Sequence, residues 1–254
     1  MRATCLAAHA IPGTARHDES TRRAFVDAIV EEILPAVARE GLADYCDAFC
    51  DRGALTTDEA RRVLQAAQGH GMATRIHANE FGQTGGVPLA AELGAKSADH
   101  LLVIDEAERQ LLRDHGIIAT LLPGTSLVLG KGFADGRALI DSGVAVAVAT
   151  DCNPGSCPIE NLALVLALAC YGCRLSPAEA VCAVTHNAAV SLDLAQEVGR
   201  LETGLSADFC ILETDDYRDL VYHAGSPLCR AIYSRGAPVR GYNPVAPPAI
   251  PSKI

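Results

Sequence analysis

The run Val144-Ala145-Val146-Ala147-Val148-Ala149-Thr150, followed directly by Asp151, indicates the fold class most clearly. A short uncharged run rich in valine is typical of a strand buried on both faces, as in a parallel sheet. A carboxylate at the tip of such a strand is paired, bound to a metal or set in a cavity, because burying it alone is costly. The stretch therefore predicts a buried strand with a functional group at its end.

Similar apolar runs precede this strand, and segments of helical period separate them. The predicted strands are residues 3–8, 47–50, 74–77, 97–101, 117–122 and 144–150, and the predicted helices between them are 20–40, 57–69, 86–93, 105–115 and 135–142. Further helices are predicted at 159–171, 175–185 and 187–194. Alternating strands and helices predict an α/β fold with a parallel sheet. The 254 residues match one (β/α)8 barrel of roughly 250 residues.

The pattern changes toward the C-terminus. The short, glycine-bounded runs 204–212 and 231–236 predict a small β module, and the proline-rich stretch 238–254 predicts an irregular tail. We therefore expect an α/β body carrying the site over residues 1–195. Residues 196–254 are expected to form the C-terminal segment of a small β domain and the tail.

Charge, hydropathy and cysteine content limit the partners and the cellular compartment that the sequence allows. With 21 Lys+Arg against 31 Asp+Glu the net charge is −10, which argues against a nucleic acid as partner. No stretch has the roughly 20 apolar residues of a membrane helix, and no secretory signal begins the sequence, so we expect a cytoplasmic protein. The ten cysteines are scattered and predicted to be reduced. For the pair Cys170-x-x-Cys173, buried inert thiols are favoured over a metal or redox site.

Titratable side chains gather where the predicted strands end. They are His9, His77 with Glu80, His100 and Asp151. A single histidine at such a place is more often structural than a ligand. Several at equivalent strand ends favour an active site, because parallel α/β barrels build their sites at that edge.

The spacing His77-x-x-Glu80 suits hydrolysis assisted by a metal. An imidazole can hold a divalent ion that lowers the pKa of water, while the nearby carboxylate binds substrate or moves its proton. His100 could polarise a carbonyl or bind an oxyanion. Asp99, just before it, is expected to cap a helix or loop. The turn-rich loop Asp151-Cys152-Asn153-Pro154-Gly155-Ser156-Cys157-Pro158 is expected to contact substrate, although a plain connection remains the alternative.

Four motifs together resemble one enzyme family. They are Arg75-Ile76-His77-Ala78-Asn79-Glu80, Ala98-Asp99-His100-Leu101, Leu121-Leu122-Pro123-Gly124-Thr125 and Thr150-Asp151-Cys152-Asn153-Pro154-Gly155-Ser156. The chain resembles the imidazolonepropionases of the metal-dependent amidohydrolase superfamily over nearly its whole length. The His-x-x-Glu and Thr-Asp elements occur across that superfamily, whereas Leu121-Leu122-Pro123-Gly124-Thr125 together with the Thr150–Ser156 motif is much closer to imidazolonepropionase.

The resemblance implies an activity and catalytic residues. Imidazolonepropionases hydrolyse the small molecule 4-imidazolone-5-propanoate to N-formimidoyl-L-glutamate in histidine degradation, with one zinc or iron ion. By resemblance, His77 and Asp151 are metal ligands, and Asp151 also takes a proton from the attacking water. Glu80 contacts the substrate and helps activate water, and His100 polarises the scissile carbonyl.

The resemblance also implies residues that bind the substrate. His9 matches a substrate-binding histidine, and Asn153, Gly155 and Ser156 match the loop that holds the ring and the product. Asn79 stands where the family usually has aspartate, which is a mild departure. A homodimer is a further implication of the family.

A larger departure is an absence. The superfamily has two metal ligands in a His-x-His motif on its first strand, and this sequence offers no such pair. The expected fold is thus an incomplete (β/α)8 TIM barrel, strands three to eight, plus part of a small β-sandwich. With two ligands, His77 and Asp151, we expect weak metal binding and little or no hydrolysis. Two alternatives are another amidohydrolase, such as an aromatic deaminase, and a non-catalytic remnant or interaction protein.

Overall fold

The fold comes from a computed structural model that describes residues 1–16 and 18–239. The chain divides into two compact units, which are taken separately below. The first comprises Met1–Leu121 and Ala138–Val146, and the second comprises Leu122–Arg137 and the chain from Ala147 onward.

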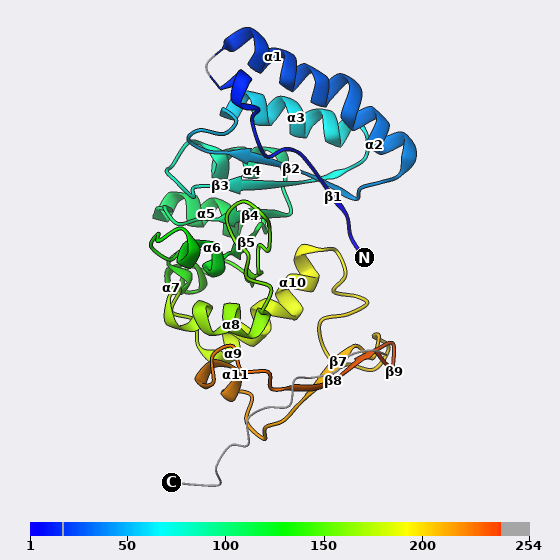
Figure 1. Cartoon of the computed structure of the whole chain (residues 1–254), viewed down its shortest axis with the longest axis vertical. Coiled ribbons are helices and arrows are strands. Elements are labelled where there is room, and N and C mark those ends of the chain that lie inside the picture. Colours follow the sequence, from blue (N-terminus) through cyan, green and yellow to red (C-terminus); the bar gives the residue numbers. More distant parts are fainter. Residues whose placement is uncertain (17, 240–254) are drawn as a thin grey trace. The chain divides into compact units, whose positions relative to one another are not determined.

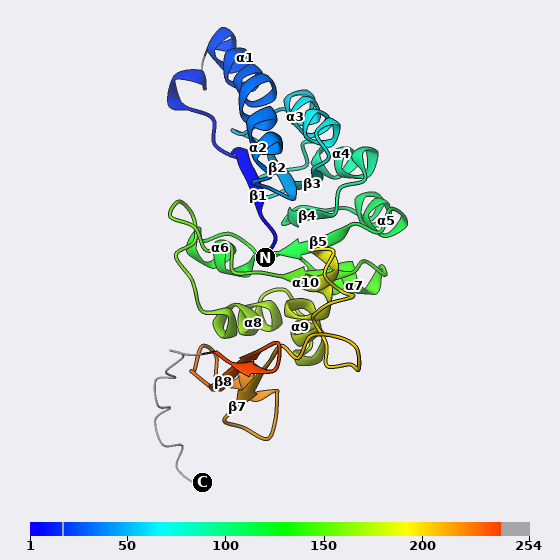
Figure 2. The same cartoon turned by 90° about the vertical axis from the view of Figure 1, so that its right-hand side faces the viewer.

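Parallel strands form the centre of the first unit. They are β1 (Thr4–Ala8), β2 (Tyr45–Cys50), β3 (Ala73–Ala78), β4 (Ser97–His100) and β5 (Ile118–Leu121), with β6 (Val146–Val148) where the chain passes into the second unit. The strands follow the chain order β1-β2-β3-β4-β5-β6 across one sheet (Figures 1 and 2). The predicted parallel α/β sheet is confirmed. Its place as strands three to eight of a barrel stays a prediction.

Helices of the first unit follow the predicted segments with one exception. They are α1 (Glu19–Ala28), α2 (Leu34–Glu40), α3 (Thr57–Gly69), α4 (Gly86–Leu93) and α5 (Glu106–Asp114), with a 3-10 turn at Gly13–Ala15. The segment predicted as a helix over 20–40 is confirmed as helical throughout, but a π-helical stretch at Ile29–Ile33 lies between α1 and α2. Pro35 lies at the start of α2 and cannot donate a backbone hydrogen bond, so the chain widens just before it.

The two faces of this sheet differ in chemistry. The register pairs Phe49 with His77 and His77 with Asp99 on adjacent strands. Because side chains alternate along a strand, these residues share one face, and buried polar groups at alternate positions lie on it as well. Ala78 points to the opposite face, where a Cβ on Gly86 at the start of α4 would lie 2.6 Å from its Cβ. Helices therefore cover one face, and the side chains of His77 and Asp99 lie on the other.

The second unit combines helices with a small antiparallel sheet. Its helices are α6 (Pro123–Val128), α8 (Leu162–Tyr171), α9 (Pro177–Val184), α10 (His186–Ser191) and α11 (Asp219–Tyr222), and α7 (Gly136–Asp141) crosses between the units. The sheet has the order β7-β8-β9, formed by β7 (Phe209–Leu212), β8 (Cys229–Ser234) and β9 (Ala237–Pro238). A small β module is confirmed, whereas a β-sandwich and a domain boundary at residue 195 stay predictions. Pro238 belongs to β9 rather than to an irregular tail, and residues 240–254 lie outside the described part.

The pair Cys170 and Cys173 has the properties of inert thiols. Burial raises the pKa of Cys173 to about 12 and that of Cys170 to about 11. Both therefore stay protonated at neutral pH, and a protonated thiol is a poor nucleophile and metal ligand. Within the described residues, no helix has the length and apolar character needed to cross a membrane.

An ion pair between Arg22 in α1 and Glu59 in α3 predicts that the stability of the fold depends on pH. Burial tends to raise the pKa of Glu59, but hydrogen bonds from Arg22 and Thr56 outweigh it and lower the pKa. The stability that Glu59 contributes is therefore present above its unfolded pKa of about 4.3 and is lost as pH falls through the lower folded pKa. We expect Glu59→Gln to reduce the free energy of unfolding by about 1 kcal/mol at pH 7 and by much less near pH 3.

Urea unfolding of the Glu59→Gln variant and the wild type at both pH values measures this difference. Glu40→Gln is the control, because the interaction of Glu40 found within residues 1–16 and 18–239 is an exposed ion pair with Arg39. An equal loss of stability at pH 7 and pH 3 in the Glu59→Gln variant would contradict the role of its charge.

Candidate functional site

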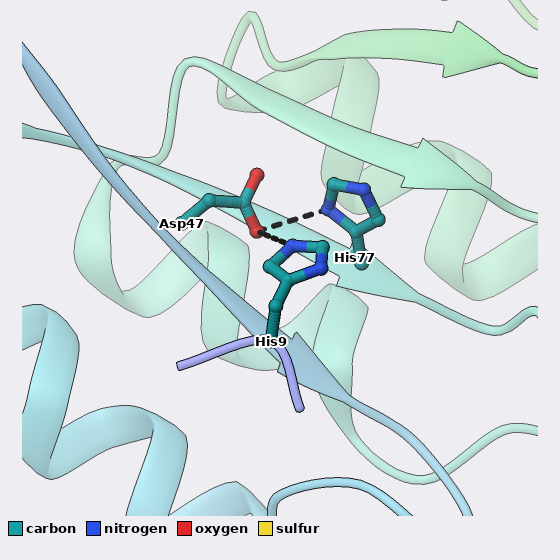
Figure 3. Close-up of side chains that lie close together, drawn as sticks. All are labelled: His9, Asp47 and His77. Carbon is teal, nitrogen blue, oxygen red and sulfur yellow. Dashed lines mark hydrogen bonds and ion pairs between the residues drawn. The ribbon is translucent and has the colours of Figure 1, made fainter. Parts of the chain in front are cut away.

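Three side chains from neighbouring strands meet at the polar face of the first unit. Asp47 lies in β2, His77 lies in β3, and His9 follows β1 directly. The Oδ1 atom of Asp47 is 2.9 Å from Nδ1 of His77 and 3.3 Å from Nε2 of His9. The two imidazole rings are edge to face, with centroids 4.2 Å apart. Figure 3 shows both rings directed at the same carboxylate oxygen.

The electrostatics of this cluster favour an ionised carboxylate. Asp47 is almost wholly buried, and burial by itself would raise its pKa. The charge of His77 and the hydrogen bonds from His77 and His9 outweigh burial and hold the pKa of Asp47 below its usual range. The cluster thus keeps an anionic oxygen between two ring nitrogens.

Glu80 and His100 form a second buried pair beside this cluster. Nε2 of His100 lies 3.6 Å from Oε2 of Glu80, which is longer than a hydrogen bond. Burial, followed by the charge of His77, lowers the pKa of His100 to about 3, so its ring is neutral near pH 7. The His100 and His77 ring centroids are 5.1 Å apart. Four of the residues predicted for the site, His9, His77, Glu80 and His100, therefore belong to one unit and adjoin one another.

The backbone at these strand ends adopts an uncommon conformation. Asn79 and His100 have φ values of 58° and 78°, in the left-handed region that non-glycine residues seldom occupy. Asp151 in the second unit has a φ of 52°. Such conformations concentrate at functional sites because surrounding contacts must hold them.

Asp99 differs from its predicted role. It caps neither a helix nor a loop but lies inside β4, with Oδ2 3.7 Å from Nδ1 of His77. Burial raises the pKa of Asp99, and the charge of His77 offsets this only in part. Its Oδ1 atom is buried and has no hydrogen-bond partner in the described part of the chain. The strand places this carboxyl on the polar face because His77 and Asp99 are paired across β3 and β4.

The remaining predicted site residues lie in the second unit. Thr125 donates a hydrogen bond to Oδ2 of Asp151. Oδ1 of Asn153 accepts from the backbone N–H groups of Gly155 and Ser156, both at 2.8 Å. These bonds form a tight turn after Asp151, in agreement with the predicted turn-rich loop. The roles of these residues toward metal and substrate stay predictions.

Comparison with known protein families identifies the family of this chain. A family model described as the amidohydrolase family matches residues 5–236, which is most of the chain. The chain belongs to the amidohydrolase family. The matched segment contains all residues of the His9, Asp47 and His77 cluster and the neighbouring Glu80 and His100.

Curated relatives of this amidohydrolase include imidazolonepropionases. The one from Desulfotalea psychrophila is 45% identical over 237 residues, covering 93% of this chain and 56% of the relative. The one from Geobacillus thermodenitrificans is 46% identical over 222 residues, covering 87% of this chain and 52% of the relative. The resemblance stated from the motifs is confirmed, and the chain spans about half the length of these relatives.

Solved structures agree on the amidohydrolase fold. An adenosine deaminase from Xanthomonas campestris, solved with bound zinc, matches 92% of this chain and 59% of its own with a TM-score of 0.69 and 19% identity. The ochratoxinase of A. niger matches with a TM-score of 0.66 and 23% identity, covering 82% of this chain and 54% of its own. At these identities the likeness concerns the fold alone.

The donor atoms of the amidohydrolase cluster fit a metal ion. His9, Asp47 and His77 each offer one ligand atom, and these atoms lie within 4.8 Å of one another. Ligands at about 2.0–2.1 Å from a tetrahedral zinc lie about 3.4 Å apart, close to the 2.9 and 3.3 Å between Oδ1 of Asp47 and the two histidine nitrogens. Two imidazoles and a carboxylate are the ligand set of many catalytic zinc sites and of some iron sites, which leave a position open. Small side-chain shifts would therefore suffice to admit the ion.

Sequence reasoning missed Asp47 as a site residue. It was assigned to a predicted strand, and a carboxylate within the apolar run Tyr45–Cys50 was the available signal. Its meeting with His77 depends on the register between β2 and β3, which the hydrophobic pattern alone does not define.

Proposed function

We propose that this chain is an imidazolonepropionase-type cyclic amidohydrolase that hydrolyses 4-imidazolone-5-propanoate to N-formimidoyl-L-glutamate with one zinc or iron ion. The observation that carries the proposal is the His9, Asp47 and His77 cluster beside Glu80 and His100. The identity of 45–46% with imidazolonepropionases supports the substrate class.

The metal would be held by His77 together with Asp47 and His9. This ion would supply Lewis-acid chemistry, which polarises a carbonyl and makes water acidic enough to attack near neutral pH. His77 and Asp151 alone would bind a metal weakly. Since the cluster offers three donors within one unit, we expect binding at a defined site.

Glu80 and His100 would transfer the proton of the attacking water and polarise the scissile carbonyl, respectively. Glu80 is a carboxylate at the edge of the cluster, suited to accept a proton from water and to return it to the leaving nitrogen. His100 is neutral near pH 7, so it can donate a hydrogen bond to the scissile carbonyl without carrying a competing charge.

Residues assigned by resemblance complete the proposal. Asp151 is proposed as a metal ligand that, together with Glu80, accepts the proton released by the attacking water, and Asn153, Gly155 and Ser156 are proposed to bind substrate and product. For His9, the resemblance implies substrate binding, whereas its 3.3 Å contact with Asp47 favours a role as ligand. His9→Ala distinguishes the two, because loss of a ligand lowers zinc affinity and loss of a substrate contact raises KM alone.

The test of the function is an assay of the zinc-loaded chain on 4-imidazolone-5-propanoate. We expect hydrolysis that disappears on chelation and returns with zinc, at a lower kcat than that of the Geobacillus thermodenitrificans relative measured in parallel. An aromatic amine substrate for deamination is the matched control and should not react. Binding of one zinc without turnover of the imidazolone would contradict the proposal and favour a non-catalytic protein.

A further inference from the structure

A buried carboxylate outside the cluster holds the loop that presents Glu80. Asp51 directly follows β2 and is 4% exposed. Its Oδ2 atom accepts hydrogen bonds from the backbone N–H groups of Glu80 at 2.6 Å and Phe81 at 3.0 Å. Its Oδ1 atom accepts from the backbone N–H of Arg52 at 2.7 Å. One side chain thus fixes two consecutive amides of the loop that follows β3.

The hydrogen bonds that Asp51 accepts are stronger than those between neutral groups. A carboxylate that accepts from backbone amides in a buried place forms shorter and stronger hydrogen bonds than a neutral acceptor. The N–H group of Glu80 belongs to the same residue whose side chain lies 3.6 Å from His100. A displacement of this amide therefore moves the start of the Glu80 side chain itself.

The loop needs such support because its backbone is held in an uncommon conformation. Asn79, just before Glu80, is wholly buried with a φ of 58°. Its Nδ2 atom donates to Oε2 of Glu108 in α5 at 2.8 Å, and Gln83 donates to the same oxygen at 2.9 Å. The loop is therefore held by acids on two sides, Asp51 acting on its backbone and Glu108 acting on its side chains.

We propose that Asp51 is a positioning residue that fixes the carboxylate of Glu80 for proton transfer. The inference rests on the proposed hydrolytic function for its effect on turnover. With or without turnover, the Asp51 carboxylate protects the backbone amides of Glu80 and Phe81 from hydrogen exchange. Asp51 has no contact with the His9, Asp47 and His77 cluster among the interactions given above, so zinc binding should not depend on it.

The test compares three substitutions at Asp51 in the full chain. Asp51→Ala removes the acceptor, and Asp51→Asn keeps the shape but turns one of the two accepting oxygens into a donor. Asp51→Glu restores the carboxylate, and an open hollow of about 390 Å3 beside Asp51 leaves room for the added methylene. We expect the amides of Glu80 and Phe81 to exchange hydrogen at least tenfold faster in the alanine variant and less so in the asparagine variant.

Turnover gives the second readout. We expect kcat to fall at least tenfold in the Asp51→Ala and Asp51→Asn variants, with KM and zinc affinity little changed and partial recovery in Asp51→Glu. Asp18→Asn is the matched control, because Asp18 also accepts a backbone N–H, that of Thr21 at 2.7 Å, at the start of α1. It should lower stability without affecting Glu80 exchange or kcat.

The two readouts separate the possible failures. If the zinc-loaded wild type does not hydrolyse the substrate, the proposed function is wrong. The role of Asp51 is then tested by the hydrogen exchange of the Glu80 and Phe81 amides alone. Unchanged exchange at Glu80 and Phe81 in the asparagine and alanine variants overturns the inference. An active enzyme whose kcat is unaffected by these substitutions overturns it as well.

Discussion

Replacing Glu80 by glutamine is expected to lower kcat for imidazolone hydrolysis by about 100-fold to 10,000-fold. Glutamine keeps the size of the side chain but can neither accept a proton from water nor return it to the leaving nitrogen. Steady-state kinetics of the zinc-loaded protein measure the loss. Zinc affinity should stay unchanged, since Glu80 is not one of the three proposed ligands.

Glu108→Gln is a control for the Glu80→Gln variant. Glu108 is also buried and acidic, and it holds the same loop through Asn79 without approaching the reacting groups. We expect this control to lower stability and to reduce kcat far less than the substitution of Glu80. A Glu80→Gln enzyme with wild-type kcat would show that the carboxylate moves no proton in the rate-limiting step.

Replacing His77 by alanine is expected to weaken zinc binding at the cluster by at least about 100-fold. His77 is central to the cluster because its ring contacts Asp47 directly and faces the ring of His9. Loss of one of three donors leaves fewer ligands than catalytic zinc sites normally have. Isothermal titration with zinc in a reducing buffer measures the change.

His115 provides the matched control for the His77→Ala variant. It is an exposed histidine at the end of α5, and its ring bonds only to the backbone oxygen of Leu111 among the interactions described. His115→Ala should bind zinc as the wild type does. Equal zinc affinity of the His77→Ala variant and the wild type would place the ion elsewhere, for example on thiols.

Much of the fold could be predicted from the sequence because the parallel strands are buried and their hydrophobic runs are continuous. The strand predicted over 74–77 is β3 at Ala73–Ala78, and that predicted over 97–101 is β4 at Ser97–His100. The division of the helix predicted over 20–40 was missed. A single proline within a helical pattern can be accommodated by a kink, a break or a π-helical stretch, and tertiary packing decides among them.

The candidate site could be predicted in part. His9, His77, Glu80 and His100 were found because the ends of parallel strands share one edge, so chain position alone brings them together. Asp47 and Asp99 reach His77 only through the register of neighbouring strands. Their roles could not be predicted, because periodicity identifies strands but does not define which residues stand opposite one another.

If the His9, Asp47 and His77 cluster holds the catalytic metal, zinc X-ray absorption of the chain loaded with one equivalent will show its ligands. Zinc bound to nitrogen and oxygen has ligands at about 2.0–2.1 Å, whereas zinc bound to cysteine has them at about 2.3 Å. With ten cysteines in the chain, the two outcomes are distinct. We expect a shell of nitrogen and oxygen with imidazole scattering that is lost in the His77→Ala variant. A sulfur shell, or an imidazole signal that His77→Ala leaves unchanged, would contradict the claim.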